Sequence, residues 1–285
     1  MSPLPNPLGG ERLSTSWRGH QLAYVQRGVG PPMVFVHSVH ACAWSMEWRT
    51  VVPTLSAHFT TYSLDLLGFG ASDHPPLEFT GALYVELISD FLAEVVRAPC
   101  VAVGSSLGAT YLIAAAARHP ERVRAVCAIG PAGVTRLDSP GGAVSGLVQR
   151  FVRSERVGAA FFGALTSKRS IRMFLKDIYA DPKVMTDEVV DLYWQSAKQP
   201  NARFGPAAFV GFRLSYDLRA ELAAMTQPLM LAWGTAARQT PLKEAAAYQR
   251  VQPRAELMTL PGGDLPHEEH PEAFCAALVS FLSRH

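Results

Sequence analysis

The chain has 285 residues, of which 48% are hydrophobic and 18% are charged, and its formal net charge is +2. This composition is typical of a folded globular protein and excludes an intrinsically disordered chain. A nearly neutral chain without runs of Lys and Arg gives no reason to expect nucleic acid as a partner. Because no apolar stretch reaches membrane-spanning length and no signal-peptide pattern is present, we expect a cytoplasmic protein with no membrane partner.

Short apolar runs alternate with segments of helical periodicity in the first part of the chain. In one of these segments Leu83, Leu87, Phe91 and Val95 recur at helical spacing. Strands that alternate with helices predict a parallel sheet covered by helices on both faces. The expected strands are residues 20–25, 33–38, 59–65, 100–104 and 123–129, and the expected helices are residues 44–57, 80–96 and 107–118.

A long helical segment interrupts this alternation. From about residue 133 to residue 219 we find no strand run, and we expect short helices at 143–152, 156–165, 170–179, 186–198 and 206–214. Strands at 228–233 and 255–260 and helices at 242–251 and 268–282 follow. We therefore expect an α/β core of residues 1–132 and 220–285 with a helical insertion at 133–219. Basic residues outnumber acidic ones in the insertion, which we interpret as a solvated face and not as an anion site.

The cysteines, and the sequence as a whole, show no pattern of a metal or cofactor site. Cys42, Cys100, Cys127 and Cys275 are far apart, and no pair has the spacing of zinc ligands or of a disulfide framework. Cys100 and Cys127 lie in apolar runs, where a thiol usually behaves as a small buried hydrophobe. We expect no metal, and no cofactor is implied.

The pentapeptide Gly104-Ser105-Ser106-Leu107-Gly108 is the motif that carries chemistry. It follows an expected strand and opens an expected helix, the context in which G-x-S-x-G marks a nucleophile elbow. The turn is sharp enough to strain the central serine, and the flanking glycines let the chain segments pass without a clash. Ser106 would then lie at a helix N-terminus, where a developing anion is favoured.

With this motif and its landmarks, the chain resembles the α/β-hydrolase fold family over nearly its full length. The landmarks are Val34-Phe-Val-His-Ser38, Asp65-Leu-Leu-Gly-Phe-Gly-Ala-Ser-Asp73, His119-Pro-Glu-Arg-Val123, Trp233-Gly234 and Pro271-Glu-Ala-Phe274. The second is typical of the dehalogenase, epoxide hydrolase and C–C hydrolase branches. The resemblance implies a mostly parallel eight-stranded sheet flanked by helices. It also implies that the insertion is a cap that closes the active site and selects the substrate.

The resemblance implies an oxyanion hole made of two backbone N–H groups, those of Leu107 and Val39. Ser38 stands where the family usually has glycine, so the loop that carries Val39 is altered. In the family the histidine at the position of His37 braces this loop. His40, in the same loop, is a candidate functional imidazole that could point into the pocket.

The triad is where the sequence departs from the family. The acid position in Trp233-Gly-Thr-Ala-Ala237-Arg-Gln-Thr-Pro241 is Ala237, and the histidine position in Gly263-Asp264-Leu-Pro266 is Asp264. A serine hydroxyl needs a base, and aspartate is normally too acidic, with a pKa of about 3.9. Burial in an apolar pocket would raise the pKa of Asp264 and suit it to that role. We interpret His267 and His270 as solvent-exposed residues at the start of a helix.

Three hypotheses for the function follow from these residues. The first is a hydrolase that acts on a small hydrophobic ester, thioester or lactone through Ser106. The second is a lyase, cyclase or isomerase that uses the oxyanion hole with Asp264 or His40. The third is a catalytically inactive ligand-binding protein of the same fold. The expected partner is a small hydrophobic molecule, bound by a monomer or homodimer in a pocket that we expect to include His37, Ser38, Trp44, Ser105, Trp194 and Ala237.

Overall fold

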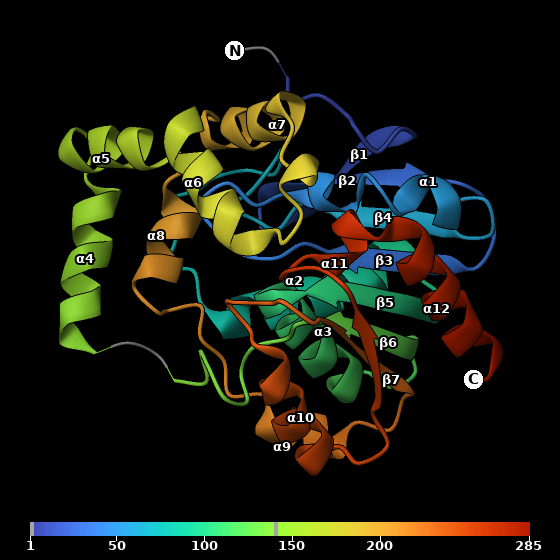
Figure 1. Ribbon diagram of the computed structural model, residues 1–285. Helices are drawn as coiled ribbons and strands as arrows, with labels where there is room; N and C mark the ends of the chain where they lie inside the picture. The colour runs from blue at the N-terminus through green and yellow to red at the C-terminus, as the bar shows by residue number, and fades with distance from the viewer. Residues whose placement is uncertain (1–2, 140–141) are drawn as a thin grey trace.

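The computed structural model describes residues 3–139 and 142–285, and within these residues the strands form one eight-stranded sheet (Figure 1). The sheet order is β1-β2-β4-β3-β5-β6-β7-β8. The pairs β1–β2 and β2–β4 are antiparallel, and the other neighbours are parallel, which confirms the predicted α/β class. The strands are β1 (Glu11–Trp17), β2 (His20–Arg27), β3 (Pro32–Val36), β4 (Thr60–Leu64), β5 (Cys100–Ser105), β6 (Val123–Ile129), β7 (Leu229–Gly234) and β8 (Glu256–Leu260).

Helices cover both faces of the sheet because its central strands are apolar on both sides. Along β3, Met33 and Phe35 pack in one cluster with α1 and α12, whereas Val34 and Val36 pack in another with α2 and α3. These helices are α1 (Val52–Leu55), α2 (Gly81–Phe91), α3 (Ser106–Arg118) and α12 (Pro271–Ser283). The remaining helices outside the insertion are α9 (Arg219–Ala224), α10 (Ala245–Val251), α11 (Pro266–Glu269) and the 3-10 helices η1 (Ser45–Trp48) and η4 (Leu242–Glu244).

The expected elements differ from the observed ones in several places. The helix expected at residues 44–57 is divided into η1 and α1, because Pro53 favours the start of a new helix. Likewise Pro271 begins α12, so the closing segment consists of two helices. The helix expected at 80–96 ends in a π-helical turn, η2 (Leu92–Val96), and Arg97 follows with a φ of 57°. Strand β1 and helix α9 were not expected, since β1 is largely polar and α9 has only six residues, too few to show a clear periodicity.

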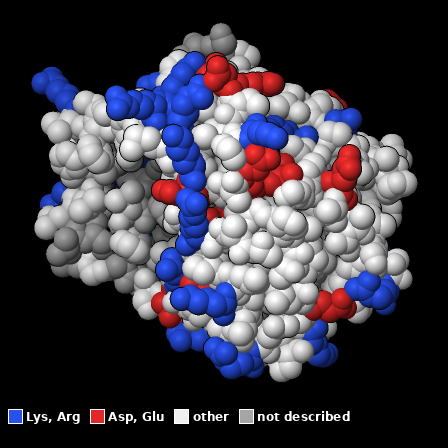
Figure 2. Space-filling model, viewed as in Figure 1, with Lys and Arg blue, Asp and Glu red and all other residues white. Residues whose placement is uncertain are grey.

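The chain between β6 and β7 contains helices and no strand among its described residues. The helices lie beyond the sheet edge at which β5 and β6 end (Figure 1). Lys and Arg side chains gather over this region and its boundary with the sheet domain (Figure 2). Several are paired, Lys168 with Asp191 and Arg238 with Asp177, as a solvated face would be. The helices are α4 (Ala143–Arg153), α5 (Val157–Leu165), α6 (Lys168–Ile178), η3 (Pro182–Val184), α7 (Asp187–Ala197) and α8 (Phe204–Val210).

All four cysteines are buried free thiols. Burial raises the pKa of Cys42 and Cys100 to about 12 and that of Cys275 to about 11, so these thiols are uncharged at neutral pH. Cys42 packs beneath α6 and α7, whereas Cys127 lies in the central strand β6. In the described parts of the chain, no helix combines the length and the apolar character needed to cross a membrane.

The start of α3 lies directly against the backbone that follows β3. A Cβ atom added to Gly108 would lie 2.2 Å from the carbonyl oxygen of His37. A Cβ atom added to Gly104 would lie 2.7 Å from the Cα atom of Ala109. Both separations are well inside van der Waals contact, so only glycine fits at either position. Gly104 thus lets β5 and α3 pass close to each other, and Gly108 brings the G-x-S-x-G turn against the loop that begins at His37.

We predict that Gly108→Ala lowers the free energy of unfolding by about 1–3 kcal/mol, because its new methyl group overpacks against immobile backbone. Gly163→Ala is the matched control, since nothing lies within 4 Å of the added carbon. Removing that helical glycine should raise stability by about 0.5–1 kcal/mol. Urea unfolding followed by circular dichroism measures both changes. Equal stability of the two variants would contradict the close packing of α3 on the loop.

Candidate active site

Ser106 sits on a strained turn between β5 and α3. Its φ is 52°, in the left-handed region that residues other than glycine rarely adopt. The turn lifts the side chain above the end of the sheet at the first residue of α3. In that position the N–H groups of the first helical turn have no partners within the helix and favour negative charge. The geometry is that of a nucleophile elbow.

The loop after β3 is held by His37. The Nε2 atom of His37 accepts a hydrogen bond from the Leu66 N–H (3.1 Å), which leaves Nδ1 as the donor to the Ser38 carbonyl oxygen (2.6 Å). Burial lowers the pKa of this imidazole, so the ring is neutral and keeps this tautomer. His37 therefore fixes the path of the loop, as the family resemblance implied.

A cavity of about 530 Å³ opens above the elbow. It brings Ser106 together with Ser105, with the loop residues Ser38, Val39 and His40, and with Asp264. Its outer wall is largely apolar and comes from α6, α7 and the segment around α8. Its remaining described lining residues are Gly130, Ala132, Thr135, Arg136, Leu137, Asp138, Phe174, Leu175, Ile178, Tyr193, Phe209, Phe212, Gln239, Thr240 and Leu265.

His40 lies where this cavity meets a second, apolar cavity of about 230 Å³ beneath the inserted helices. Its ring packs against those of Phe174 and Tyr193, with centroids 5.1 and 5.3 Å away. Nδ1 accepts a hydrogen bond from the Cys42 N–H (3.3 Å), so the neutral ring carries its proton on Nε2. Burial lowers the pKa of His40 to about 3. Near neutral pH this imidazole can donate a hydrogen bond from Nε2.

Asp264 joins two loops at the cavity wall. Its carboxylate accepts hydrogen bonds from the backbone N–H groups of Arg238 (3.1 Å), Gln239 (3.0 Å) and Thr240 (2.9 Å). Since Arg238 follows Ala237 directly, the two positions where the family has its triad partners are neighbours in space. The carboxylate thus ties together the two loops from which those partners would come.

Five of the expected pocket or oxyanion residues lie outside the cavity lining, as far as the structure describes the chain, and His37 is one of them. Leu107 is fully buried, and only its backbone N–H at the start of α3 is relevant to an oxyanion. Trp44 packs in a buried cluster with residues of α6 and α7. Trp194 lies under the ammonium groups of Lys168 and Lys198. Ala237 packs at the edge of the core.

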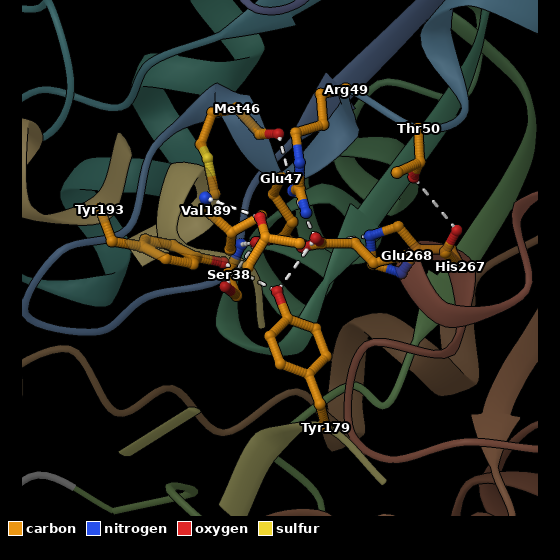
Figure 3. Close-up of polar contacts among 11 residues, drawn as sticks. Ser38, Met46, Glu47, Arg49, Thr50, Tyr179, Val189, Tyr193, His267 and Glu268 are labelled. Carbon is orange, nitrogen blue, oxygen red and sulfur yellow. Dashed lines mark hydrogen bonds and ion pairs between the residues drawn. The ribbon is translucent and has the colours of Figure 1, made fainter. Parts of the chain in front are cut away.

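Behind the loop lies Glu47, which sequence analysis did not single out (Figure 3). Its Oε2 atom accepts hydrogen bonds from the Ser38 N–H (2.9 Å) and from the Ser38 hydroxyl (2.5 Å). The side chain is buried, and burial raises the pKa of this carboxyl to about 7, while the hydrogen bonds from Ser38 oppose the rise. The Ser105 hydroxyl also faces this carboxylate. One acidic group thus binds Ser38 directly and lies toward Ser105.

Close to Glu47 lies a buried polar network that reaches the insertion (Figure 3). Arg49 forms an ion pair with Glu268 of α11, and the Tyr179 hydroxyl donates to the same carboxylate at 3.0 Å. The Tyr193 hydroxyl lies 3.5 Å from that of Tyr179, and Tyr193 also lines the cavity. The network therefore connects η1, α11 and the inserted helices α6 and α7.

The interpretation of His267 as a solvated residue is wrong. Its side chain is fully buried, stacked on Trp48 with ring centroids 4.7 Å apart. Nε2 lies 3.6 Å from Oε1 of Glu47, and burial lowers the pKa of His267 to about 3. Helix α11 has only four residues, and it buries the side chain of His267 because it packs against Trp48 of η1. The polar sequence around His267 gives no sign of this packing.

Comparison with known proteins gives a consistent picture. The model of the family described as "Alpha/beta hydrolase family" matches residues 33–277. A 2-(acetamidomethylene)succinate hydrolase from Mesorhizobium japonicum is 27% identical over 265 residues, which cover 90% of each chain. A pimeloyl-[acyl-carrier protein] methyl ester esterase from Aeromonas hydrophila is 24% identical, over 90% of this chain and 96% of its own. The structure of a serine hydrolase involved in carbazole degradation superimposes with a TM-score of 0.80 at 21% identity, covering 97% of this chain and 100% of that one.

We predict that Glu268→Ala lowers the free energy of unfolding by about 3–5 kcal/mol, because it leaves the Arg49 guanidinium buried without its partner. The side chains of Arg49 and Glu268 are 13% and 0% exposed. Glu86→Ala removes the ion pair with Arg18, in which both side chains are about half exposed, and should change stability by less than about 1 kcal/mol. Thermal or urea unfolding compares the two variants, and similar losses would contradict a structural role for the buried network.

Proposed function

Because the chain belongs to the alpha/beta hydrolase family, we propose that it hydrolyses a small hydrophobic ester, thioester or lactone at Ser106. The observation that carries this proposal is the elbow itself. Ser106 has a φ of 52° and opens into a cavity with a largely apolar wall. A serine in strained backbone geometry lowers the stability of the fold, and strain of this kind is concentrated at functional sites.

In the proposed reaction the Ser106 hydroxyl attacks the acyl carbon and loses its proton. The carbonyl electrons move to oxygen, and the oxyanion accepts hydrogen bonds from the backbone N–H groups of Leu107 and Val39. Collapse of this intermediate expels the alcohol, thiol or enol and leaves an acyl-serine. Water then attacks the acyl carbon, and the acid product leaves.

Asp264 is the proposed proton acceptor, because it lines the cavity from the loop in which the family has its histidine. It is a weak base, since three backbone N–H groups already donate to its carboxylate and stabilise the ionised form. Asp138 also lines the cavity, but its carboxylate pairs with Arg219 at 3.6 Å. His40 supports a different role. With its proton on Nε2 it can donate to the substrate, from a position between Phe174 and Tyr193.

The preference for a hydrophobic acyl or aryl group rests on the walls of the two cavities. Phe174, Leu175, Tyr193 and Phe209 line both. The names of the two relatives support hydrolysis as the reaction class, since one is a hydrolase named for a succinate derivative and the other is an esterase named for a methyl ester. A cavity of about 530 Å³ is within the range of small-molecule sites.

We predict that a fluorophosphonate probe labels the protein and that Ser106→Ala abolishes the labelling. The same substitution should lower p-nitrophenyl butyrate hydrolysis by at least about 10³-fold, because it removes the nucleophile. Ser139→Ala, on an exposed serine, is the control and should label normally. Wild-type protein that binds an apolar ester tightly without labelling would instead support a ligand-binding protein. Turnover without labelling would support a lyase or isomerase.

We also predict that Ala237→Asp combined with Asp264→His raises ester turnover by about 10²-fold or more, because it supplies a base of suitable pKa beside the elbow. The neighbouring positions of the two residues make this pairing geometrically reasonable. Asp264→His alone is the control, since an imidazole without its acid is less well oriented. Steady-state kinetics at pH 8 measures the gain. The absence of any gain would contradict the proposal that the weak base at position 264 limits turnover.

A further inference from the structure

The buried carboxylate of Glu47 has no place in the reaction described so far. It lies behind the cavity and not in its described lining, so it does not touch the substrate. Its Oε2 atom nevertheless accepts two hydrogen bonds from one residue, the N–H and the hydroxyl of Ser38. Ser38 directly precedes Val39, whose N–H is the proposed second oxyanion donor. The orientation of the Ser38–Val39 backbone is therefore fixed on one side by this carboxylate.

The same side chain also faces the other half of the site. The buried hydroxyl of Ser105, the residue before Ser106, lies toward Glu47. Packing brings the two halves together independently, because Gly108 of α3 lies against the His37 carbonyl oxygen. Glu47 is therefore located between the loop that presents Val39 and the turn that presents Ser106.

We propose that Glu47 is a positioning residue for the oxyanion hole, which in its ionised form holds the Ser38–Val39 backbone in the catalytic orientation. This inference rests on the proposed function of Ser106. It also accounts for Ser38, which replaces the usual glycine of the family. The Ser38 hydroxyl provides the second hydrogen bond to the carboxylate, which glycine could not make.

The surroundings of Glu47 make its charge sensitive to pH near neutrality. Burial raises its pKa to about 7, and Glu268 adds to the rise by charge repulsion. His267 is 3.6 Å away but neutral, because burial lowers its pKa to about 3. The guanidinium of Arg49 forms its ion pair with Glu268 and not with Glu47. The Tyr193 hydroxyl is un-ionised because burial raises its pKa. No neighbouring cation among these groups is paired with Glu47.

Ionisation of Glu47 has opposite consequences for activity and for stability. An ionised carboxylate accepts stronger hydrogen bonds from Ser38, so catalysis should rise as pH increases through about 7. Because the folded protein holds this proton more tightly than the unfolded chain does, stability from this group falls as pH rises from about 4.5 to about 7. A residue that only stabilised the fold would not produce this opposition.

The test is Glu47→Gln, which keeps the shape but cannot ionise. A glutamine carbonyl oxygen in the place of Oε2 can still accept both hydrogen bonds from Ser38, but it is a neutral acceptor and makes weaker ones than an ionised carboxylate. We expect wild-type kcat/KM for ester hydrolysis to rise about tenfold from pH 6 to pH 8, as ionisation with a pKa near 7 requires. In Glu47→Gln we expect a flat profile, a kcat at pH 8 lowered about 10- to 100-fold and an unchanged KM. We also expect its free energy of unfolding to decline less than that of the wild type between pH 5 and pH 8.

Two further variants separate this role from a general structural one. Ser38→Ala removes the hydroxyl bond that lowers the pKa of Glu47, so the midpoint of the activity profile should move above 7. Tyr179→Phe removes a hydrogen bond to Glu268, which acts on Glu47 only by charge repulsion, and should move the midpoint less than Ser38→Ala does. An unaltered pH profile in Glu47→Gln, or equal midpoint shifts in Ser38→Ala and Tyr179→Phe, would overturn the proposal.

Amide hydrogen exchange keeps this test independent of the proposed function. After correction for intrinsic rates, protection of the Ser38 amide should increase from pH 6 to pH 8 in the wild type and not in Glu47→Gln. If Ser106 neither labels nor turns over but this protection is seen, the proposed function fails and the control of the loop by Glu47 stands. If Ser106 labels and the protection is absent, the proposed function stands and the role of Glu47 is refuted.

Discussion

The contact on which the site depends is the close approach of α3 to the backbone after β3. Gly108 allows it, because any side chain there would overlap the His37 carbonyl oxygen. Without this contact, the elbow at Ser106 and the loop at Val39 would face each other across a wider gap. The positive φ of Ser106 adds a local cost that the packed sheet must offset. Strain at the serine and tight packing at the glycine are thus two parts of one constraint.

Around this contact, the polar groups are arranged in layers. His37 holds the loop from within by two hydrogen bonds, and Glu47 holds it from behind by two more. Further out, the pair of Arg49 and Glu268 links the same region to Tyr179 of the insertion. Buried charges of this kind contribute little net stability, but the loss of one partner is costly. Their arrangement favours a single orientation of the loop.

Much of the fold could be predicted from the sequence, because its strands are apolar and its motifs are local. The runs that became β3, β5, β6 and β7 have the length and composition of buried strands, and the pentapeptide around Ser106 has its structural context beside it in the chain. Glu47 could not be found in this way. Its role depends on burial and on contact with Ser38, nine residues earlier, whereas on a sequence it resembles any surface glutamate. His267 was misjudged for the same reason, since its polar neighbours suggest solvent while packing against Trp48 excludes it.

Because the four cysteine thiols are buried, the rate at which each reacts with an alkylating reagent measures local opening of the structure around it. In the folded state each is shielded and protonated, so an alkylating reagent reacts only when the surrounding segment moves away. Cys42 lies beneath α6 and α7, and Cys127 lies in the central strand β6. Modification of Cys42 would therefore report movements of α6 and α7 away from the residues they cover, and modification of Cys127 would report loss of the whole sheet. The ratio of the two rates is a measure of how independently the insertion moves.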